Sequence, residues 1–229
     1  ADPTRHTDPG TTFDDHLRRY VNETRAKGGI PVLFNSIVRR NFVQPKDTSI
    51  SKDVRRTPGE SEPPKEGTVL FDTHGAYLDS PRNVAKELGV AFIDMNKITH
   101  DLVEGLGPVE SKKLFMFVEP DQVPAFPKGR EDNTHLNVYG ARVIAGLAVE
   151  AIGKAVPELA PYIRHYDYVV AQDGSGDFFT LDEALKAIPA RKKCTVLVRT
   201  GQYGLKPEIR NKLIKITEDE GVTYGSPAI

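Results

Sequence analysis

Short apolar runs alternate with helical repeats of apolar residues along the first two thirds of the chain. The runs have the length and composition of buried strands and occupy residues 30–34, 69–71, 90–94 and 114–118. Around them, apolar residues recur at helical spacing in the segments 13–24, 77–88, 98–106 and 138–152. This alternation predicts an α/β domain whose parallel sheet is covered by helices on both faces.

The pattern changes character around residues 157–165. Beyond this point, residues 168–171, 195–198 and 213–217 have strand character, and Thr180 with Glu183 forms a capping box that opens a short helix. We therefore expect two domains, residues 1–163 and residues 164–229. The last stretch of about 60 residues holds few apolar side chains, so we expect it to lack an independent core.

Residues 39–66 form a long segment rich in charge, proline, serine and threonine. Such a loop is long enough to be either functional or mobile. Arg39, Arg40 and Asn41 at its start are candidates for substrate contact, because guanidinium groups suit the carboxylate of an acidic sugar. The alternative is an ordinary solvated loop.

Charge and hydropathy narrow the classes of partner. The 31 basic and 32 acidic residues give a net charge of −1, so nothing favours nucleic acid or an anionic membrane, although an acidic substrate is compatible with a local basic patch. No apolar segment is long enough to cross a bilayer, and the start has no signal-peptide pattern. The first residue is Ala1, so we expect a processed, recloned or truncated beginning.

The cysteine and histidine content argues against a metal centre. Cys194 is the only cysteine, which excludes an intrachain disulfide, and its apolar surroundings predict a small buried side chain. The six histidines are too scattered to indicate a metal site. His74 and His100 are expected to be hydrogen-bonded within the fold or exposed on its surface. We expect no metal and no cofactor.

The main candidate chemistry is an acid and an imidazole spaced three residues apart. Asp132 and His135 lie just before the last helical pattern of the α/β part, where we expect a loop that follows a strand. Sites in open parallel sheets lie in such loops. His135 would act as a general base for a hydroxyl nucleophile, and Asp132 would hold its tautomer. The alternative is a surface aspartate beside a satisfied histidine.

Several segments in order resemble a known family of esterases. They are GGIPV at 28–32, RRNF at 39–42, LGVAFID at 88–94, DNTHL at 132–136 and GA at 140–141. Together they resemble rhamnogalacturonan acetylesterases, which are SGNH/GDSL hydrolases, over roughly residues 12–160. The resemblance implies a flavodoxin-like three-layer fold and serine-type deacetylation of pectic polysaccharide without metal or cofactor. It also implies that His135 is the catalytic base and Asp132 its partner.

The family's nucleophile is not found in the sequence. It lies in a Gly-Asp-Ser segment, and the oxyanion donors are a glycine and an asparagine of a Gly-x-Asn-Asp segment; this chain contains neither segment. We therefore expect an internal piece that lacks the first strands of its sheet and has negligible activity alone. Ser36 and Ser80 are the alternatives if a nucleophile is present.

The tail has a second resemblance. The run YVVAQDGSGDF at 168–178, with TL at 180–181, EAL at 183–185, IP at 188–189 and TGQY at 200–203, is similar to the start of pectin methylesterases. The resemblance covers roughly residues 166–217 and implies the capping helix and first coil of a right-handed parallel β-helix. The catalytic residues of those enzymes belong to later coils, which this chain does not contain.

Together, the two resemblances predict a piece of a two-module carbohydrate esterase that degrades pectin. Its partners would be acetylated rhamnogalacturonan and methylated homogalacturonan, and its location would be secreted or periplasmic. The alternatives are a non-catalytic chain that at most binds polysaccharide, and a merely structural α/β domain with a disordered tail.

Overall fold

The computed structural model describes residues 7–44, 67–189, 191–210 and 213–225. These residues form two compact units. The first contains Ala1–Asn137 and Ile144–Pro161, and the second contains Val138–Val143 and Tyr162–Ile229. Each unit is described by itself below.

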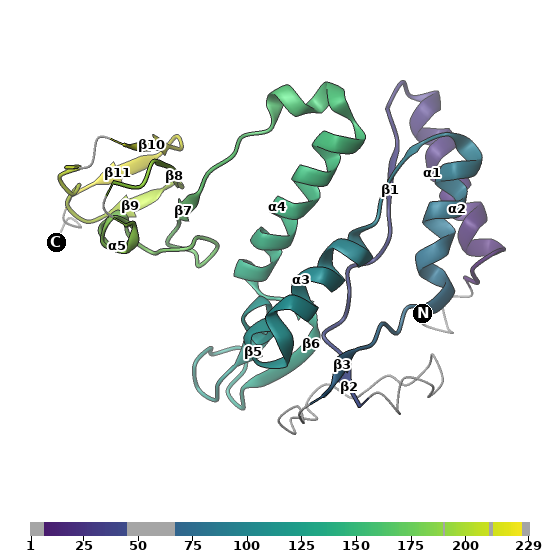
Figure 1. The fold of residues 1–229 in the computed structure, drawn as a ribbon, viewed down its shortest axis with the longest axis horizontal. Helices are drawn as coiled ribbons and strands as arrows, with labels where there is room; N and C mark the ends of the chain where they lie inside the picture. The colour runs from purple at the N-terminus through teal and green to yellow at the C-terminus, as the bar shows by residue number, and fades with distance from the viewer. Residues whose placement is uncertain (1–6, 45–66, 190, 211–212, 226–229) are drawn as a thin grey trace. The chain divides into compact units, whose positions relative to one another are not determined.

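The α/β part of the chain begins with α1 and ends after α4 (Figure 1). Its helices and strands, in order, are α1 (Thr12–Ala26), β1 (Val32–Phe34), β2 (Phe42–Val43), β3 (Val69–Leu70), η3 (Gly75–Leu78), α2 (Asp79–Leu88), β4 (Ala91–Ile93), α3 (Met95–Glu110), η4 (Ser111–Leu114), β5 (Phe115–Val118), β6 (Arg130–Leu136), α4 (Val138–Ala155) and η5 (Pro157–Tyr162).

A parallel strand pair forms the centre of the first unit. Strand β1 pairs with β4, with Val32 opposite Ala91 and Phe34 opposite Ile93. Helix α2 packs against both strands, and the α4 residues of this unit pack against them through a cluster that includes Ile93 and Ile144. The pair lies between the two helices in Figure 1. The predicted α/β class and the parallel pairing of these two segments are confirmed.

Two further strand pairs in this unit are antiparallel: β2 with β3, and β5 with β6. The prediction of parallel pairing throughout is therefore wrong. The physical reason lies in the connection from β5 to β6, which is a short proline-rich loop without a helix, whereas a parallel pair requires a longer crossover. The same finding corrects the placement of Asp132 and His135, which lie on β6 rather than in a loop.

The loop between β5 and β6 depends on a glycine. Gly129 has a φ of +74°, and a Cβ atom there would lie 2.7 Å from the Val118 carbonyl oxygen. The turn that returns the chain to β6 therefore has no room for a side chain at this position. This close approach occurs directly before β6, the strand that carries Asp132.

Beyond the start of α4 (Val138–Val143), the second unit contains short parallel strands and the helix α5. Its elements are β7 (Tyr168–Val170), α5 (Leu181–Ala187), β8 (Cys194–Val198), β9 (Gly201–Tyr203), β10 (Ile214–Glu218) and β11 (Val222–Tyr224). Strands β10, β8 and β7 form one sheet in this order, and β11 pairs with β9. Ile214 is opposite Cys194 and Val222 is opposite Gly201, so β8 followed by β9 is repeated by β10 followed by β11.

The second unit has an apolar core of its own, which corrects the expectation that the tail would lack one. The buried residues of this core are Val170, Leu181, Ala184, Ile188, Cys194, Val196, Val198 and Tyr203. Parallel stacking brings the apolar residues of successive strands together beneath α5, so few apolar residues are enough to enclose a core. Cys194 is buried as predicted, and burial raises the pKa of its thiol.

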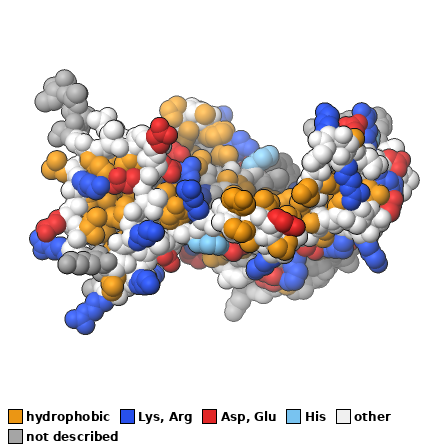
Figure 2. All heavy atoms as spheres, turned by 90° about the horizontal axis from the view of Figure 1, so that it is seen from above, with side chains coloured by type: hydrophobic (Ala, Val, Ile, Leu, Met, Phe, Trp, Pro, Cys, Tyr) orange, Lys and Arg blue, Asp and Glu red, His pale blue; other side chains and the backbone are white. Residues whose placement is uncertain are grey.

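The face drawn in Figure 2 carries side chains of both signs of charge. Figure 2 shows Lys and Arg side chains interspersed with Asp and Glu side chains over the visible face. Among the helices of the described segments, none is long and apolar enough to cross a membrane.

The capping box of α5 gives a test of how this helix contributes to stability. The Thr180 hydroxyl accepts a hydrogen bond from the Glu183 amide at 3.2 Å, and the Glu183 carboxylate accepts one from the Thr180 amide at 3.1 Å. We expect Thr180→Ala to lower the free energy of unfolding by about 1 kcal/mol, because the helix loses its cap. Urea unfolding followed by circular dichroism measures the change. Thr180→Ser, which keeps the hydroxyl, should retain most of the stability, and an equal loss in both variants would contradict this assignment.

Candidate active site

Asp132 is a buried carboxylate on β6. Its side chain is 2% exposed, so its charge must be satisfied by hydrogen bonds from the protein. Oδ1 accepts from the amides of Thr134 at 2.8 Å and His135 at 2.9 Å, and Oδ2 accepts from Arg130 and from the His135 ring. Burial alone would raise the pKa of this carboxyl, but the hydrogen bonds from His135, Arg130 and Thr134 outweigh it and hold the pKa well below its ordinary value. Asp132 is therefore ionised at neutral pH.

The imidazole of His135 is oriented by this carboxylate. Its Nδ1 lies 2.8 Å from Asp132 Oδ2, while its side chain is 68% exposed. An ionised carboxylate can only accept a hydrogen bond, so Nδ1 carries the proton and the neutral ring keeps a lone pair on Nε2. The ring is thus an exposed base with a fixed tautomer, which is the arrangement that a hydroxyl nucleophile requires of its partner.

Arg130 is a part of this arrangement that the sequence analysis missed. Its Nε lies 3.2 Å from Asp132 Oδ2, and its guanidinium group lies over the Phe126 ring at 5.1 Å from the centroid. Residues two apart on a strand share a face, so the spacing from Arg130 to Asp132 was the available signal. This spacing is informative only if the segment is known to be a strand.

Arg40 connects the segment after β1 to the site. Its amide donates to the Asn133 carbonyl at 2.8 Å, and its guanidinium donates to Asn133 Oδ1 at 2.5 Å, to Ser111 Oγ at 3.0 Å and to the Pro108 carbonyl. The residue is 7% exposed, and burial lowers the pKa of its guanidinium to about 10. These contacts fix Asn133, which lies between Asp132 and His135 in the chain.

The three residues selected from sequence for substrate contact are thus found in different surroundings. The contacts of Arg40 are made within the chain, and Asn41 Nδ2 donates to the Phe71 carbonyl at 3.3 Å. Arg39 is half-buried and its Nη1 donates to Thr73 Oγ1 at 3.0 Å. Contact of any of them with substrate stays a prediction.

The structure places the two alternative serines differently. Ser80 lies within α2 and is 2% exposed, while Ser36 is exposed shortly after the end of β1. Across residues 7–44, 67–189, 191–210 and 213–225, no serine hydroxyl hydrogen-bonds to His135. In the same residues, no group of three or more His, Cys, Asp or Glu side chains could hold a metal ion.

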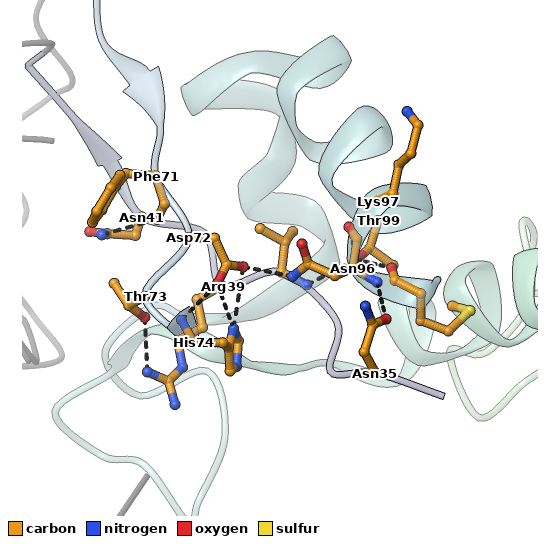
Figure 3. Close-up of polar contacts among 12 residues, drawn as sticks. Asn35, Arg39, Asn41, Phe71, Asp72, Thr73, His74, Asn96, Lys97 and Thr99 are labelled. Carbon is orange, nitrogen blue, oxygen red and sulfur yellow. Dashed lines mark hydrogen bonds and ion pairs between the residues drawn. The ribbon is translucent and has the colours of Figure 1, made fainter. Parts of the chain in front are cut away.

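A second polar cluster, also missed in the sequence analysis, lies at the ends of the parallel strands. Asn35 follows β1 and Asp94 follows β4, and Asn35 Nδ2 donates to Asp94 Oδ1 at 2.7 Å. Asn35 Oδ1 accepts from the amide of Asn96, whose side chain donates to Asp72 (Figure 3). The signal for this cluster was the position of Asn35 and Asp94 immediately after two strands that pair in parallel.

The ionisation of Asp132 predicts a pH dependence of stability. Its pKa is lower in the folded protein than in the unfolded chain, so its stabilising effect is present above the unfolded value of about 3.9 and is lost as the pH falls toward the folded value. We expect Asp132→Asn to lower the free energy of unfolding most at neutral pH, with the difference from the parent narrowing below about pH 4. Urea unfolding over a pH series measures this. A difference that stays constant over the whole series would show that the charge of Asp132 does not stabilise the fold.

Three known proteins are similar to this chain. Rhamnogalacturonan acetylesterase RhgT of Bacillus subtilis (strain 168) is 34% identical over 170 residues, which are 74% of this chain and 61% of that protein. The probable rhamnogalacturonan acetylesterase YesY of the same strain is 23% identical over 150 residues, which are 66% of this chain and 54% of that protein. The pectinesterase/pectinesterase inhibitor of Ficus pumila var. awkeotsang is 62% identical over 39 residues, which are 16% of this chain and 7% of that protein.

No family model matches the chain, and no solved structure gives a significant match. The chain spans 61% and 54% of the length of the two acetylesterases. It is similar to rhamnogalacturonan acetylesterases over most of its own length, and this similarity supports a relationship to the SGNH hydrolases.

Proposed function

We propose that the chain is part of a carbohydrate esterase that removes acetyl groups from rhamnogalacturonan. The observation that carries this proposal is the contact of His135 Nδ1 with the buried Asp132 carboxylate, which leaves Nε2 as an exposed base. The identity of 34% to an acetylesterase adds the substrate class. Ester hydrolysis in this scheme needs no metal and no cofactor.

The proposed mechanism is acyl transfer through a serine. His135 takes the proton from the serine hydroxyl as the hydroxyl attacks the acetyl carbonyl, and then gives that proton to the departing sugar oxygen. Asp132 keeps the ring in the correct tautomer and stabilises its charged form. In the second half of the reaction, His135 takes a proton from water as the water attacks the acetyl-enzyme. Acetate is released, and the proton returns to the serine oxygen. The serine and the oxyanion donors would come from Gly-Asp-Ser and Gly-x-Asn-Asp segments of a longer protein, since this sequence contains neither segment.

The second unit favours an additional candidate function for the longer protein. It is supported by the identity of 62% over 39 residues to a pectinesterase/pectinesterase inhibitor and by the repeated parallel strand pairs. We propose that residues 164–229 begin a pectinesterase-like β-helix, so that the whole protein would also hydrolyse methyl esters of homogalacturonan. We propose a secreted or periplasmic location on the basis of the resemblance to pectin-degrading esterases.

Activity measurements on two forms of the protein test the acetylesterase proposal. We expect the 229-residue chain to release negligible acetate from acetylated rhamnogalacturonan, because its sequence contains no Gly-Asp-Ser segment to supply the nucleophile. We expect a longer chain that carries the Gly-Asp-Ser and Gly-x-Asn-Asp segments to release acetate. In this longer chain, His135→Ala should lower kcat about 10⁴- to 10⁶-fold, and Asp132→Asn about 10⁴-fold.

His100→Ala is the matched control, because His100 is a partly exposed histidine on α3 beside Glu104. It should leave the rate unchanged. Acetate release by the 229-residue chain that His135→Ala abolishes would instead show that Ser36 or another serine of this chain is the nucleophile. If both His135→Ala and Asp132→Asn keep full activity in the longer chain, His135 is not the base. Binding of polysaccharide without turnover in the longer chain would favour the non-catalytic alternative.

A further inference from the structure

A second acid and imidazole pair lies in the first unit, directly after β3. His74 Nδ1 lies 2.9 Å from Asp72 Oδ1, and the His74 amide donates to the same oxygen at 2.7 Å (Figure 3). Both side chains are largely buried, with exposed fractions of 14% for His74 and 16% for Asp72. Burial alone would raise the pKa of the Asp72 carboxyl, but hydrogen bonds from His74 and Asn96 outweigh it and lower the pKa. The ionised carboxylate fixes the proton of the neutral ring on Nδ1, so Nε2 faces away from Asp72.

The polar cluster at the ends of β1 and β4 hydrogen-bonds the Asp72 carboxylate of this pair. Asn96 Nδ2 donates to Asp72 Oδ2 at 2.7 Å, and the Asn96 amide donates to Asn35 Oδ1 at 2.9 Å. Figure 3 shows Asn35, Asn96, Asp72 and His74 as one connected series. The carboxyl ends of parallel strands are the edge at which open α/β sheets bind their ligands. The imidazole is therefore rigidly placed at the edge where a ligand is expected.

Arg39 lies beside this imidazole, and among the described residues no carboxylate pairs with it. Its Nη1 donates to Thr73 Oγ1 at 3.0 Å, and Thr73 lies between Asp72 and His74 in the chain (Figure 3). The side chain is half-buried, yet within the described ranges no carboxylate forms an ion pair with it. A guanidinium group has five N–H donors, and the contact with Thr73 uses one of them. The remaining donors are suited to a planar anion such as a carboxylate.

Consecutive arginines connect this place to the proposed catalytic base. Arg39 contacts Thr73, whereas Arg40 contacts Asn133, which lies between Asp132 and His135. The two acid and imidazole pairs are thus joined through adjacent residues of one segment.

We propose that Arg39 and His74 form a subsite for an acidic sugar, in which Arg39 binds the carboxylate of a uronic acid and His74 Nε2 hydrogen-bonds a neighbouring ring hydroxyl. This subsite deepens the proposed function, because rhamnogalacturonan contains galacturonic acid. Asp72 and Asn96 act as positioning residues that hold the imidazole. With its proton on Nδ1, the ring can accept a hydrogen bond from the hydroxyl at Nε2. The acidic sugar supplies a negative charge to Arg39, for which the described residues provide none.

Calorimetric titration of the 229-residue chain with trigalacturonic acid tests the subsite without requiring turnover. We expect the acidic trisaccharide to bind more tightly than the neutral galactotriose, and the difference to shrink as salt is added. Arg39→Gln should weaken binding of the acidic trisaccharide about 10- to 100-fold and leave the neutral one unchanged. His74→Gln should weaken binding of both sugars, because it removes a contact to a hydroxyl.

Three variants provide controls. Arg19→Gln removes an exposed arginine of α1 that pairs with Glu23, and it should not change binding. Arg39→Lys keeps the charge but loses the fork, so its affinity should lie between those of the parent and Arg39→Gln. Thr73→Val removes the contact that orients Arg39 without changing any charge, and it should weaken binding less than Arg39→Gln. Circular dichroism of each variant reports whether the fold is retained.

Three results would overturn the subsite. The first is equal affinity for the acidic and neutral trisaccharides, and the second is no detectable binding of the acidic trisaccharide at millimolar concentration. The third is unchanged binding in a folded Arg39→Gln variant. The test of the subsite and the test of the esterase proposal can fail independently of each other. Arg39-dependent binding together with a longer chain that releases no acetate would refute only the esterase proposal. Acetate release together with binding that is independent of Arg39 would refute only the subsite.

Discussion

The burial of one negative charge, on Asp132, organises the candidate site. A carboxylate that is 2% exposed is stable in the fold only if hydrogen bonds replace the water it has lost. Arg130, the amides of Thr134 and His135, and the His135 ring together supply them. The same contacts that satisfy the charge lie in the irregular stretch of β6 between Asp132 and Leu136, and they orient the imidazole. The contacts that stabilise the buried charge therefore also fix the orientation of the His135 ring.

Much of the fold could be predicted because local rules govern it. Helix α2 ends at Gly89, which adopts the left-handed conformation with a φ of 61°, and the cap at Thr180 begins α5. The three-residue spacing of Asp132 and His135 identified a pair that the structure brings into contact. These features depend on a few neighbouring residues, so a single sequence was enough to find them.

The features that could not be predicted depend on distant parts of the chain. Nothing in the sequence around Arg40 shows that its guanidinium is buried, because Ser111 and Asn133 are far away in the chain. Strand β6 is rich in polar residues, and only its pairing with β5 makes it a strand. The core of the second unit likewise arises from stacking of segments such as β8 and β10, each of which is only five residues long.

The break in α3 has a consequence for how the first unit can vary. Gly107 has a non-helical φ of 71° and ψ of 178°, and the residue after it is Pro108, whose carbonyl accepts a hydrogen bond from the buried Arg40 guanidinium. A straight helix would direct that carbonyl along its own axis, and one N–H of Arg40 would be buried without an acceptor. The helix break and the buried arginine are thus mutually dependent. Substitutions at positions 40 and 107–108 act on one shared contact, so their effects on stability are coupled rather than additive.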